Sequence, residues 1–588
     1  LKLPYVLGFT FPRIDPYFLD RIEVYYGPAS VLYGQAIPGG LINLVSKRPT
    51  AYSFYHFQFQ TGYYGLAQGA FDIGGPIDKD GQFLFRLTGL ARETETQVKH
   101  TQNERLAIAP ALTWQPGPDT TLTVLGSYLY DPREFGFNEL PLEGTAFPNP
   151  NGKIPSTFYS GDADFDRFKR SQYYVGYMFE QRLGDRVVLS QNFRFMHQNV
   201  YYNLVWPLGF EPDLRTMDRI AQKTRENLDV LTIDNHAQVK LNTGPVKHTL
   251  LAGLDYQYFW WNQRFGDTEG PSLDYLDPDY FQPIPDFPFA SKARQKQDQL
   301  GLYMQDQAQF GDLFLLLGGR YDWADTKTRS QDLIDDTVAN EKQDDHAFTW
   351  RAGAVYVLNV GLAPYFSYSE SFLPTAGTDF SGNPFKPTRG KQYEAGIKYQ
   401  PEWFNGFFTA AVYDLTETNV LTADPENPFF NIQTGEIRSR GVELSGVASP
   451  VKGLDVTAAY SYLDNKVTKA DDGTQGKHPV GIPDNTASVW ANYMFPCGYL
   501  AGFGVGGGVR YYGSSWGDSF NTFKIPGATI VDAVAQYDFG ALFPNLKGLS
   551  LAVNASNLFD KHYLAFCQDF GCYYGLNRNV QVGINYNW

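Results

Sequence analysis

The 588-residue sequence lacks any apolar run long enough to cross a membrane as a helix. Such a helix needs about 18 consecutive apolar residues, and no stretch of this chain approaches that length. Windows with a convincing apolar period of 3.6 residues are few, and no linker divides the chain. Because a soluble chain of this length normally splits into several domains, the sequence excludes a helical membrane protein and argues against a helical soluble one.

Basic residues are in the minority. The chain has 48 Lys and Arg against 63 Asp and Glu, which gives a formal net charge of −15. Nucleic-acid binding depends on clustered Lys and Arg, so this balance argues against a nucleic-acid partner. The chain starts at Leu1-Lys2-Leu3-Pro4 without a signal peptide. We interpret this start as that of a mature or trimmed fragment rather than a cytoplasmic protein.

Cysteine is scarce, with three residues in the whole chain. Cys567 and Cys572 lie close together in one predicted loop, whereas Cys497 stands alone in a predicted turn. In an oxidising compartment the first two can form a local disulfide. Two unpaired thiols are the alternative, and the spacing leaves both open.

The sequence also lacks a catalytic or metal-binding constellation. No histidine has a second His or Cys at the spacing of a metal site. The fragment from Asp162 to Asp166 lacks the Gly and terminal Glu of an EF-hand. Gly504 to Gly508 alternate as a strand, without the Lys of a phosphate-binding loop. We therefore predict no enzyme activity, no metal site and no resident cofactor. The eight histidines are His56, His100, His197, His236, His248, His346, His478 and His562.

Aromatic residues and glycine are abundant, with 40 Tyr, 45 Phe and 57 Gly. The last ten residues alternate apolar and polar side chains up to Trp588. The same two-residue period runs from Tyr55 to Gln60 and from Phe503 to Tyr511. This period predicts strands with one apolar face. A soluble β-sandwich shows the same alternation, so a single strand does not decide the class.

The lengths of the connections are more informative. Ten short turn-like breaks alternate with longer polar connections, an asymmetry that is typical of an outer-membrane barrel with periplasmic turns and extracellular loops. Ten turns and eleven loops join 22 strands, with about 24 residues for each strand and its connection. We predict an all-β membrane protein, a 22-stranded antiparallel transmembrane β-barrel whose wide lumen needs a plug. The largest predicted loops span residues 131–170, 203–225, 262–295 and 325–345.

A long motif runs from Arg21 to Gln35 and continues from Pro38 to Pro49. It closely resembles the end of the plug domain in TonB-dependent siderophore receptors. The resemblance covers essentially the whole chain, and it is nearest to the ferric hydroxamate receptors of the ferrichrome type. It implies that residues 1–50 are the C-terminal part of a plug domain and residues 51–588 the barrel. Further matching segments are residues 303–309, 317–322, 390–396, 435–443 and 557–563, together with the paired cysteines.

The chain departs from this family in two respects. The family's plug runs well over a hundred residues, so the segment on which TonB pulls is not in this sequence. Tyr26 stands where members usually carry an Arg, part of an ion cluster with two barrel carboxylates that match Glu394 and Glu443. The resemblance places Arg21, Glu23, Glu394 and Glu443 at the contact between plug and barrel. Either another Arg compensates for the change, or plug and barrel are held together differently.

The predicted ligand pocket consists of aromatic residues near the external ends of the strands. A hydroxamate siderophore encloses Fe³⁺, so a protein meets a compact and nearly neutral shell that aromatic faces and a few hydrogen bonds can hold. An aromatic girdle at the membrane interface is the alternative role for such residues. The predicted ligand-binding residues are Tyr5, Phe9 and Phe11 from the plug and Phe135, Phe137, Tyr201, Tyr202, Trp206, Trp260, Trp261, Phe265, Tyr573 and Tyr574 from the loops.

We therefore predict an outer-membrane receptor of a Gram-negative bacterium that binds a ferric siderophore and imports it with energy delivered through TonB. Ferrichrome or ferrioxamine is the expected type of cargo, and iron arrives inside it. The other predicted partners of this monomer are outer-membrane lipid and lipopolysaccharide. A haem receptor is disfavoured by the lack of a His pair, and a catecholate receptor by an aromatic, uncharged pocket. A passive porin would lack residues 21–49, and a secreted β-rich enzyme would need a catalytic constellation.

Overall fold

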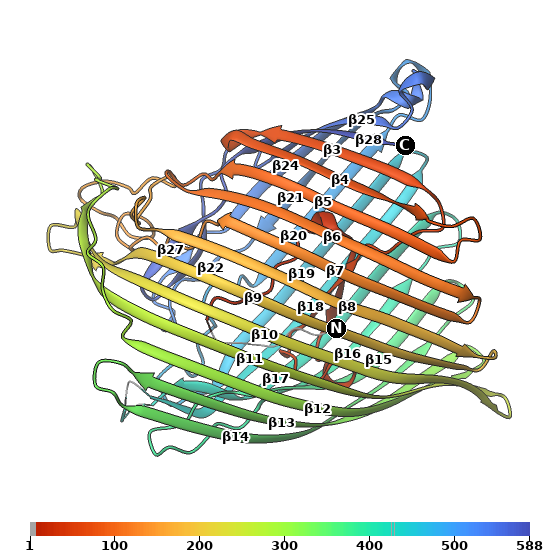
Figure 1. Ribbon diagram of the computed structural model, residues 1–588, viewed down its shortest axis with the longest axis horizontal. Helices are drawn as coiled ribbons and strands as arrows, with labels where there is room; N and C mark the ends of the chain where they lie inside the picture. The colour runs from red at the N-terminus through yellow and green to blue at the C-terminus, as the bar shows by residue number, and fades with distance from the viewer. Residues whose placement is uncertain (1–7, 425, 428–429) are drawn as a thin grey trace.

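The computed structural model describes residues 8–424, 426–427 and 430–588. Within this range, twenty-two antiparallel strands form one closed barrel, in which β28 pairs with β3 (Figure 1). The predicted 22-stranded antiparallel barrel is confirmed. The barrel strands are β3 (Phe54–Gly62), β4 (Leu66–Pro76), β5 (Phe83–Glu95), β6 (Gln102–Gly117), β7 (Thr120–Arg133), β8 (Arg167–Leu183), β9 (Val187–Phe210), β10 (Thr216–Thr243), β11 (Val246–Asp274), β12 (Ser291–Phe310), β13 (Leu313–Asp332), β14 (Val338–Tyr356), β15 (Leu362–Leu373), β16 (Thr388–Tyr399), β17 (Asn405–Ala423), β18 (Asn431–Val451), β19 (Leu454–Lys469), β20 (Asn485–Met494), β21 (Phe503–Tyr512), β24 (Ala528–Asp538), β25 (Leu549–Ser556) and β28 (Asn579–Asn587).

Alternation along the strands separates an outer, lipid-facing row of side chains from an inner, polar row. In β3, Tyr55, Phe57 and Phe59 are 40%, 51% and 53% exposed. Gln58 and Gln60, which lie between them, line a cavity in the lumen. Exposed aromatic residues in regular alternation with buried polar residues are the reverse of a soluble sheet, and they identify the outer face as the surface that meets lipid.

Each of the ten predicted short turns joins two successive strands at one end of the barrel. The four shortest have two residues each, and among them are those that connect β10 to β11 and β12 to β13. Gly244 and Gly311, which have φ angles of +61° and +57°, allow the chain to reverse there.

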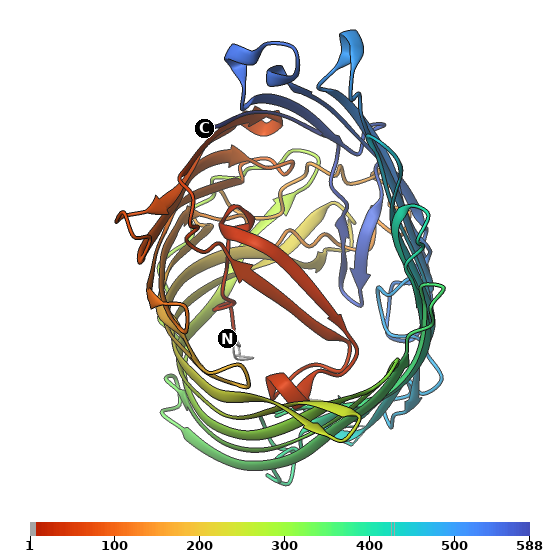
Figure 2. The ribbon, with the colours of Figure 1, turned by 90° about the vertical axis from the view of Figure 1, so that its right-hand side faces the viewer.

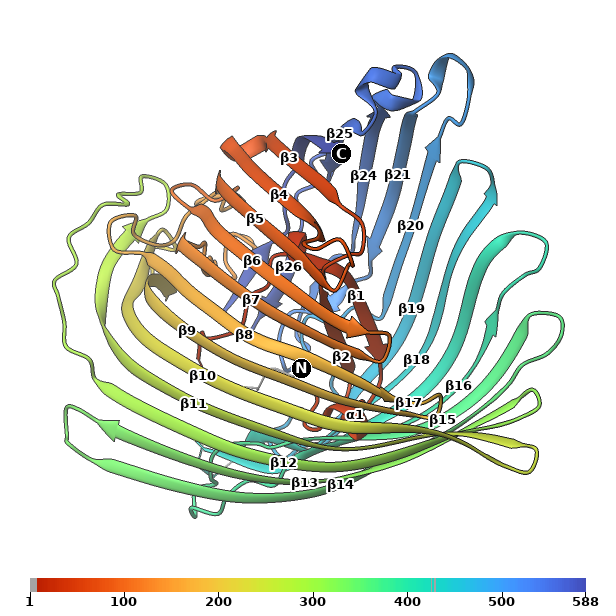
Figure 3. The same ribbon diagram turned by 45° about the vertical axis from the view of Figure 1, so that its right-hand side comes forward.

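Three of the four long loops predicted from the sequence are mostly strand. Of residues 203–225, only 211–215 lie between the ends of β9 and β10, and the hairpins β11–β12 and β13–β14 likewise extend far into predicted loops. Figure 3 shows these long hairpins rising beyond the rest of the wall. Above the membrane neither face of a hairpin meets lipid, so its sequence has no apolar row for the two-residue period to reveal.

Residues that precede the barrel cross the lumen, as the view along the barrel in Figure 2 shows. They form η1 (Pro16–Phe18), β1 (Leu19–Tyr26), the single turn α1 (Ser30–Tyr33) and β2 (Gly40–Ser46), with β1 and β2 paired as a hairpin. After α1 the chain bonds to β15. The Phe372 N–H donates to Ser30 Oγ at 3.1 Å, and the Ala36 N–H donates to the Phe372 carbonyl at 2.9 Å. This segment therefore occupies the place expected of a plug, while its boundary at residue 50 stays a prediction.

Two small hairpins fold among the loops at the other end of the barrel, and four short 3₁₀ turns complete the described range. The hairpins pair β22 (Ser515–Trp516) with β23 (Lys524–Ile525) and β26 (Leu564–Gln568) with β27 (Gly571–Tyr574). The 3₁₀ turns are η2 (Tyr63–Gly65), η3 (Gly498–Leu500), η4 (Phe539–Ala541) and η5 (Pro544–Leu546). Among the helices of the described residues, none is long and apolar enough to span a membrane.

Candidate ligand-binding site at the external mouth

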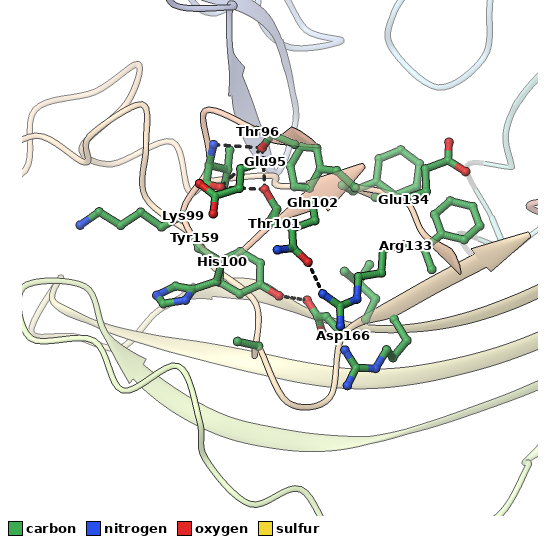
Figure 4. Close-up of a pocket in the computed structure, with 18 of the residues that line it drawn as sticks. Glu95, Thr96, Lys99, His100, Thr101, Gln102, Arg133, Glu134, Tyr159 and Asp166 are labelled. Atoms are coloured by element: carbon green, nitrogen blue, oxygen red, sulfur yellow. Dashed lines mark hydrogen bonds between the residues drawn. The ribbon is translucent and has the colours of Figure 1, made fainter. Parts of the chain in front are cut away.

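A cavity of about 790 Å³ lies at the end of the barrel that carries the long loops (Figure 4). It brings together the loop between β5 and β6, the loop between β7 and β8, and the external part of β9. Three of the predicted ligand-binding residues, Phe135, Phe137 and Tyr202, line it. Its walls come from residues 95–102, 133–137, 157–168 and 202–204, together with Tyr64.

One wall of the cavity is aromatic, and the plug contributes to it. The rings of Phe9 and Tyr202 meet edge to face, with centroids 4.7 Å apart. Phe168 of β8 stacks on the other side of Tyr202 at 4.4 Å, and Phe137 lies 6.2 Å from Phe9. Tyr202 faces inward because alternate residues of β9 turn toward the lumen. The arrangement offers a compact apolar surface to a ligand.

Two hydrogen-bond donors in this wall are unused. Tyr202 is 4% exposed, and its hydroxyl donates to no group in the described part of the chain. The indole N–H of Trp206, which packs against the same aromatic cluster, also lacks an acceptor there. Leaving a buried donor unpaired costs about 1–3 kcal/mol. Both donor atoms lie within the protein and have no acceptor there, so they can bond to a ligand oxygen only if the side chains around them move.

The other side of the cavity carries charges of both signs, which corrects the prediction of an uncharged pocket. Glu134 accepts from Arg13 of the plug at 3.0 Å and pairs with Arg170 at 3.1 Å. Arg133 donates to Gln102, as Figure 4 shows. The basic lining residues, Lys99, Arg133 and Arg167, are matched in number by the acidic ones, so the rim does not present the concentrated positive charge that a triply anionic ligand requires. The acidic lining residues are Glu95, Glu134 and Asp166.

Asp166, which ends the loop between β7 and β8, is a buried carboxyl group on the wall of the cavity. It accepts from the Tyr159 hydroxyl at 2.5 Å and from the Val205 N–H at 2.8 Å. Burial raises the pKa of Asp166 to about 7, the nearby Asp162 adds to the rise, and the two hydrogen bonds oppose it. This loop residue therefore changes its charge close to neutral pH.

The last loop of the barrel docks onto the loop between β7 and β8. Cys567 and Cys572 form a disulfide that links β26 to β27. Leu140 exchanges two backbone hydrogen bonds with Cys572, at 3.0 and 2.8 Å. Two loops that are more than four hundred residues apart in sequence thus form one lid over part of the mouth.

Tyr573 and Tyr574 serve this lid and do not line the cavity. The Tyr573 hydroxyl donates to Glu139 at 3.0 Å, and the Tyr574 hydroxyl donates to the carbonyl of Ile154 at 2.7 Å. Both hydroxyls are used within the protein. The structure therefore places these two tyrosines behind the candidate site, where they hold its loops.

Trp261 of β11 supports the plug side of the aromatic wall. It is 2% exposed, and its indole N–H donates to Glu226 at 3.3 Å. The same carboxylate oxygen accepts from the Phe9 N–H at 2.8 Å. Trp261 and Glu226 thereby fix the position of Phe9. Phe265 lies four residues farther along the same face of β11.

Tyr201 and Trp260 lie on the outer face of the wall, away from the cavity, which corrects their predicted place in the pocket. They are 37% and 38% exposed, whereas their neighbours Tyr202 and Trp261 are buried. Arg225 lies over the ring of Tyr201, and Lys296 over that of Trp260. Because successive residues of a strand point to opposite faces, only one member of each aromatic pair can face the lumen.

The remaining plug residues of the predicted site are Tyr5 and Phe11. Tyr5 lies outside the described residues. The side chain of Phe11 is 52% exposed, and its carbonyl accepts from Gln198 at 3.3 Å. Whether either touches a ligand stays a prediction.

The four residues predicted at the contact between plug and barrel do not form one cluster. Arg21 pairs with Glu23 at 2.6 Å inside the plug, where the guanidinium is exposed and the carboxylate is half-buried. Glu394 accepts from Tyr365 at 2.6 Å and from Gln392 at 2.8 Å. Across the described residues, neither Glu394 nor Glu443 forms an ion pair with the plug. Two neutral donors of the barrel thus satisfy the carboxylate of Glu394, and the role of an Arg in holding plug to barrel stays a prediction.

The sequence did not identify several residues of the site. Phe168 and Tyr159 pack at the cavity, and Asp166 titrates there, but none of them belongs to a motif. Phe168 could have been found from the alternation at the start of β8, since Arg167 and Lys169 on either side are polar. No group of three or more His, Cys, Asp and Glu able to hold a metal ion occurs among the described residues.

Residues 113–558 match the family model described as "TonB dependent receptor-like, beta-barrel". The chain is 40% identical to the ferrichrome outer membrane transporter/phage receptor of Escherichia coli, with 96% of this chain and 78% of that protein covered. It is 35% identical to the ferrioxamine B receptor of Salmonella typhimurium, with 97% and 81% covered.

Among solved structures, the chain resembles the siderophore receptor PiuA from Acinetobacter baumannii, with a TM-score of 0.87 at 20% identity. The likeness covers 97% of this chain and 87% of that one. It also resembles the closed form of the ferric-catecholate import receptor Fiu from Escherichia coli, with a TM-score of 0.85 at 21% identity and with 97% and 87% covered. At this level of identity, the likeness concerns the fold.

Proposed function

The chain belongs to the family of TonB-dependent receptors, and from this premise we propose that it binds a ferric siderophore of the hydroxamate class and imports it. It resides in the outer membrane of a Gram-negative bacterium. Its work is binding and transport, with energy that reaches the plug through TonB. The siderophore brings the iron, so the protein supplies no metal ligand.

The observation that carries this proposal is the aromatic wall with two unused donors at the mouth. Phe137, Phe168 and Tyr202 line the cavity, and Phe9 packs against them. The Tyr202 hydroxyl lies inside this wall without an acceptor among the described residues. A hydroxamate complex offers a compact shell with carbonyl and amide groups, which suits such a wall. The relatives named for ferrichrome and ferrioxamine B support the same class.

Binding titrations with ferrichrome, ferrioxamine B and ferric enterobactin test the proposal. Quenching of intrinsic fluorescence by each complex gives the dissociation constant. We expect submicromolar binding of at least one of the two hydroxamates and weaker binding of the catecholate. Submicromolar affinity for ferric enterobactin alone would overturn the choice of class.

We also propose that lipopolysaccharide surrounds the external half of the barrel. On the outer face, Arg225 pairs in register with Arg264, and Arg264 with Lys292. The next two rows of that face pair Arg294 with Arg329, and Lys296 with Lys327 and Lys342. Together these residues form a basic belt on a chain with a net charge of −15. Below the belt lies one row of aspartates, Asp298, Asp325 and Asp344, and the outer face of β12 then becomes apolar at Leu300 and Leu302.

A basic belt above an apolar wall matches the charge order of lipid A, which carries phosphates above its acyl chains. Part of the charge is balanced within the protein, since Lys327 pairs with Asp325 and Lys342 with Asp344. Arg294 and Lys292 form no ion pair among the described residues. They are therefore the members best placed to bind phosphate.

A further inference from the structure

Two periplasmic turns form an apolar projection on one side of the barrel. They are residues 495–502, between β20 and β21, and residues 539–548, between β24 and β25. We call them the periplasmic foot. The two turns touch, since the Asp538 N–H donates to the Gly502 carbonyl at 2.8 Å. In Figure 2, which looks at this end, they stand outside the ring of strands.

Most of the exposed side chains of the foot are apolar. Tyr499 is fully exposed, Leu500 is 50% exposed, and Phe543 is 52% exposed. Leu542 and Leu546 are 41% and 39% exposed. Lys547 is the one charged residue in these eighteen positions. Contiguous exposed apolar side chains mark a surface that meets a partner or a membrane.

The foot continues the lipid-facing wall. Phe503 of β21 pairs with Tyr537 of β24 on the outer face. Phe495 stacks on Phe503 with centroids 6.1 Å apart, and Phe539 meets Tyr537 edge to face at 4.8 Å. These aromatics form the girdle at the periplasmic rim, where Tyr, Trp and Phe are enriched in membrane barrels. The apolar side chains of the foot begin where this girdle ends.

Several backbone N–H groups of the foot are hydrogen-bonded within their own turn, which lowers the cost of removing them from water. Each turn contains 3₁₀ structure, and its N–H groups find acceptors nearby. Phe543 donates to Phe539 at 2.9 Å, Leu546 to Phe543 at 2.8 Å, and Ala501 to Gly498 at 3.1 Å. An unpaired backbone group is costly in contact with lipid, whereas a bonded one is tolerated at the interface. In a turn that remains in water, solvent molecules can bond to the backbone groups instead.

We propose that the foot lies in the phospholipid leaflet that faces the periplasm and anchors this side of the barrel there. Apolar side chains at the level of the headgroups and upper acyl chains bind such a leaflet as an interfacial segment does. Two of the two-residue turns, at Gly244-Pro245 and Gly311-Asp312, carry no exposed large apolar side chain, whereas the turns at residues 357–361 and 400–404 expose Val360 and Trp403. The proposal is independent of the identity of the cargo.

The chain supplies its own reporter for a test. Cys497 lies within the foot and is exposed, while the other two cysteines form the disulfide. We would attach an environment-sensitive fluorophore to Cys497 in detergent and reconstitute the protein into phospholipid vesicles. A matched control carries Cys497→Ser and Asp312→Cys, which moves the label to a polar turn at the same end of the barrel.

We expect a blue shift on reconstitution and strong quenching by brominated phosphatidylcholine at position 497, with little of either at position 312. Equal quenching of both labels by aqueous iodide would place the foot in water and overturn the proposal. Shielding of position 497 from both quenchers would indicate a protein cover, such as a second copy of this chain, and would also overturn it.

A pair of substitutions adds a second measurement. Tyr499→Ser together with Phe543→Ser removes the two large exposed rings, and we expect the quenching of the Cys497 label by brominated lipid to fall. Phe570→Ser, which removes an equally exposed ring from the external loops, should leave it unchanged. Intact migration of the unheated barrel on a gel would verify that each variant is folded. Unchanged lipid quenching in the folded double variant would overturn the assignment of these rings to the leaflet.

Discussion

Tyr202 occupies the point where the plug, the wall and the cavity meet. Its ring packs between Phe9 and Phe168, while its hydroxyl has no acceptor among the described residues. The two parts of this side chain therefore have different roles. The ring contributes to packing, and the hydroxyl is free for a ligand.

Tyr202→Phe is expected to weaken siderophore binding by roughly 2- to 10-fold, the worth of one net hydrogen bond, without loss of stability. Tyr202→Ala removes the ring as well and should cost about 3–5 kcal/mol of local packing. Fluorescence titration with ferrichrome measures the first effect. Tyr201→Phe is the matched control, because Tyr201 faces outward. Equal affinities of the unmodified protein, Tyr202→Phe and Tyr201→Phe would contradict a binding role for the Tyr202 hydroxyl.

Trp206→Ala is expected to reduce siderophore uptake while barrel assembly stays intact, because the indole N–H is an unused donor and the ring packs on the same cluster. Uptake of radioactive iron as a hydroxamate complex, with receptor amount measured in the same cells, gives the result. Trp260→Ala on the outer face is the control. Normal uptake by the Trp206 variant would remove this part of β9 from the site.

Among the elements around the cavity, the loop between β7 and β8 contributes a large part of its wall. It carries Asp166 and Tyr159, and Arg219 of β10 donates to the Gly161 carbonyl at 2.8 Å. The lid contacts at Leu140 attach the same loop to the disulfide hairpin. Its order depends on these contacts and on a buried apolar cluster in which Leu140, Ile154 and Phe158 pack against Met217 and Leu273, and not on the barrel ladder.

The stability of this loop is expected to fall as pH rises from about 4 to about 7. The folded pKa of Asp166, about 7, lies above its ordinary value of 3.8, so the folded form holds a proton that the unfolded form has lost. Its stabilising contribution is complete below the ordinary pKa and is lost as pH rises through the folded value. Hydrogen exchange of residues 134–166 between pH 5 and pH 8 measures this.

Asp166→Asn keeps the shape of the side chain and removes its titration. The variant should show a flatter pH dependence of exchange, with a residual slope from Asp162, whose pKa burial also raises. Tyr159, Tyr202 and Arg219 also face this carboxyl. Burial raises the pKa of the two tyrosines, which stay neutral over the range tested, and lowers the pKa of Arg219. An unchanged slope in the Asn variant would show that another group controls the loop.

Replacing Cys567 and Cys572 by Ser is expected to loosen the β26–β27 hairpin and leave the barrel unaffected. The disulfide closes a short loop, for which chain entropy predicts about 2 kcal/mol of local stability. Proteolysis and hydrogen exchange at residues 564–574 should increase, along with exchange at Leu140, which bonds to Cys572. The melting temperature of the barrel is the internal control, and a fall in it would contradict a local role.

At the scale of the whole molecule, the barrel must match an asymmetric membrane at both ends. The basic belt lies at the external end, and the apolar foot lies at the periplasmic end. The girdle and the outward rows of aromatic residues connect the two. These features use the outer face of the same strands whose inner face holds the plug and the ligand site.

Lys292→Glu with Arg294→Glu is expected to abolish the extra thermal stability that lipopolysaccharide confers on the reconstituted barrel. Each cation contributes about 1 kcal/mol to binding an anionic lipid surface, and reversal adds repulsion. The control, Lys240→Glu with Lys247→Glu, makes the same change of charge near the periplasmic turns. Thermal shifts that are equal with and without lipopolysaccharide in the unmodified protein would refute the belt.

Much of the fold could be predicted from the sequence because the membrane imposes a simple rule on each strand. Residues such as Tyr55 and Phe57 must face lipid and their neighbours the lumen, so a two-residue period is written into the chain. The rule fails above the membrane, which is why the hairpins at residues 203–225 and 262–295 were predicted as loops. The rule also does not show which of the adjacent residues Tyr201 and Tyr202 faces the lumen, since that depends on the register of β9 in the barrel.

The class of the protein, the number of strands and the turns could be predicted from the chain alone, because they depend on local periodicity and on neighbours in the chain. Which aromatic residues meet at the mouth, and that Asp166 lies beside Tyr159, became known from the three-dimensional structure. It also brought the last loop onto residues 139–140. Those contacts join segments hundreds of residues apart, and closure of the barrel, not local sequence, sets which of them face each other.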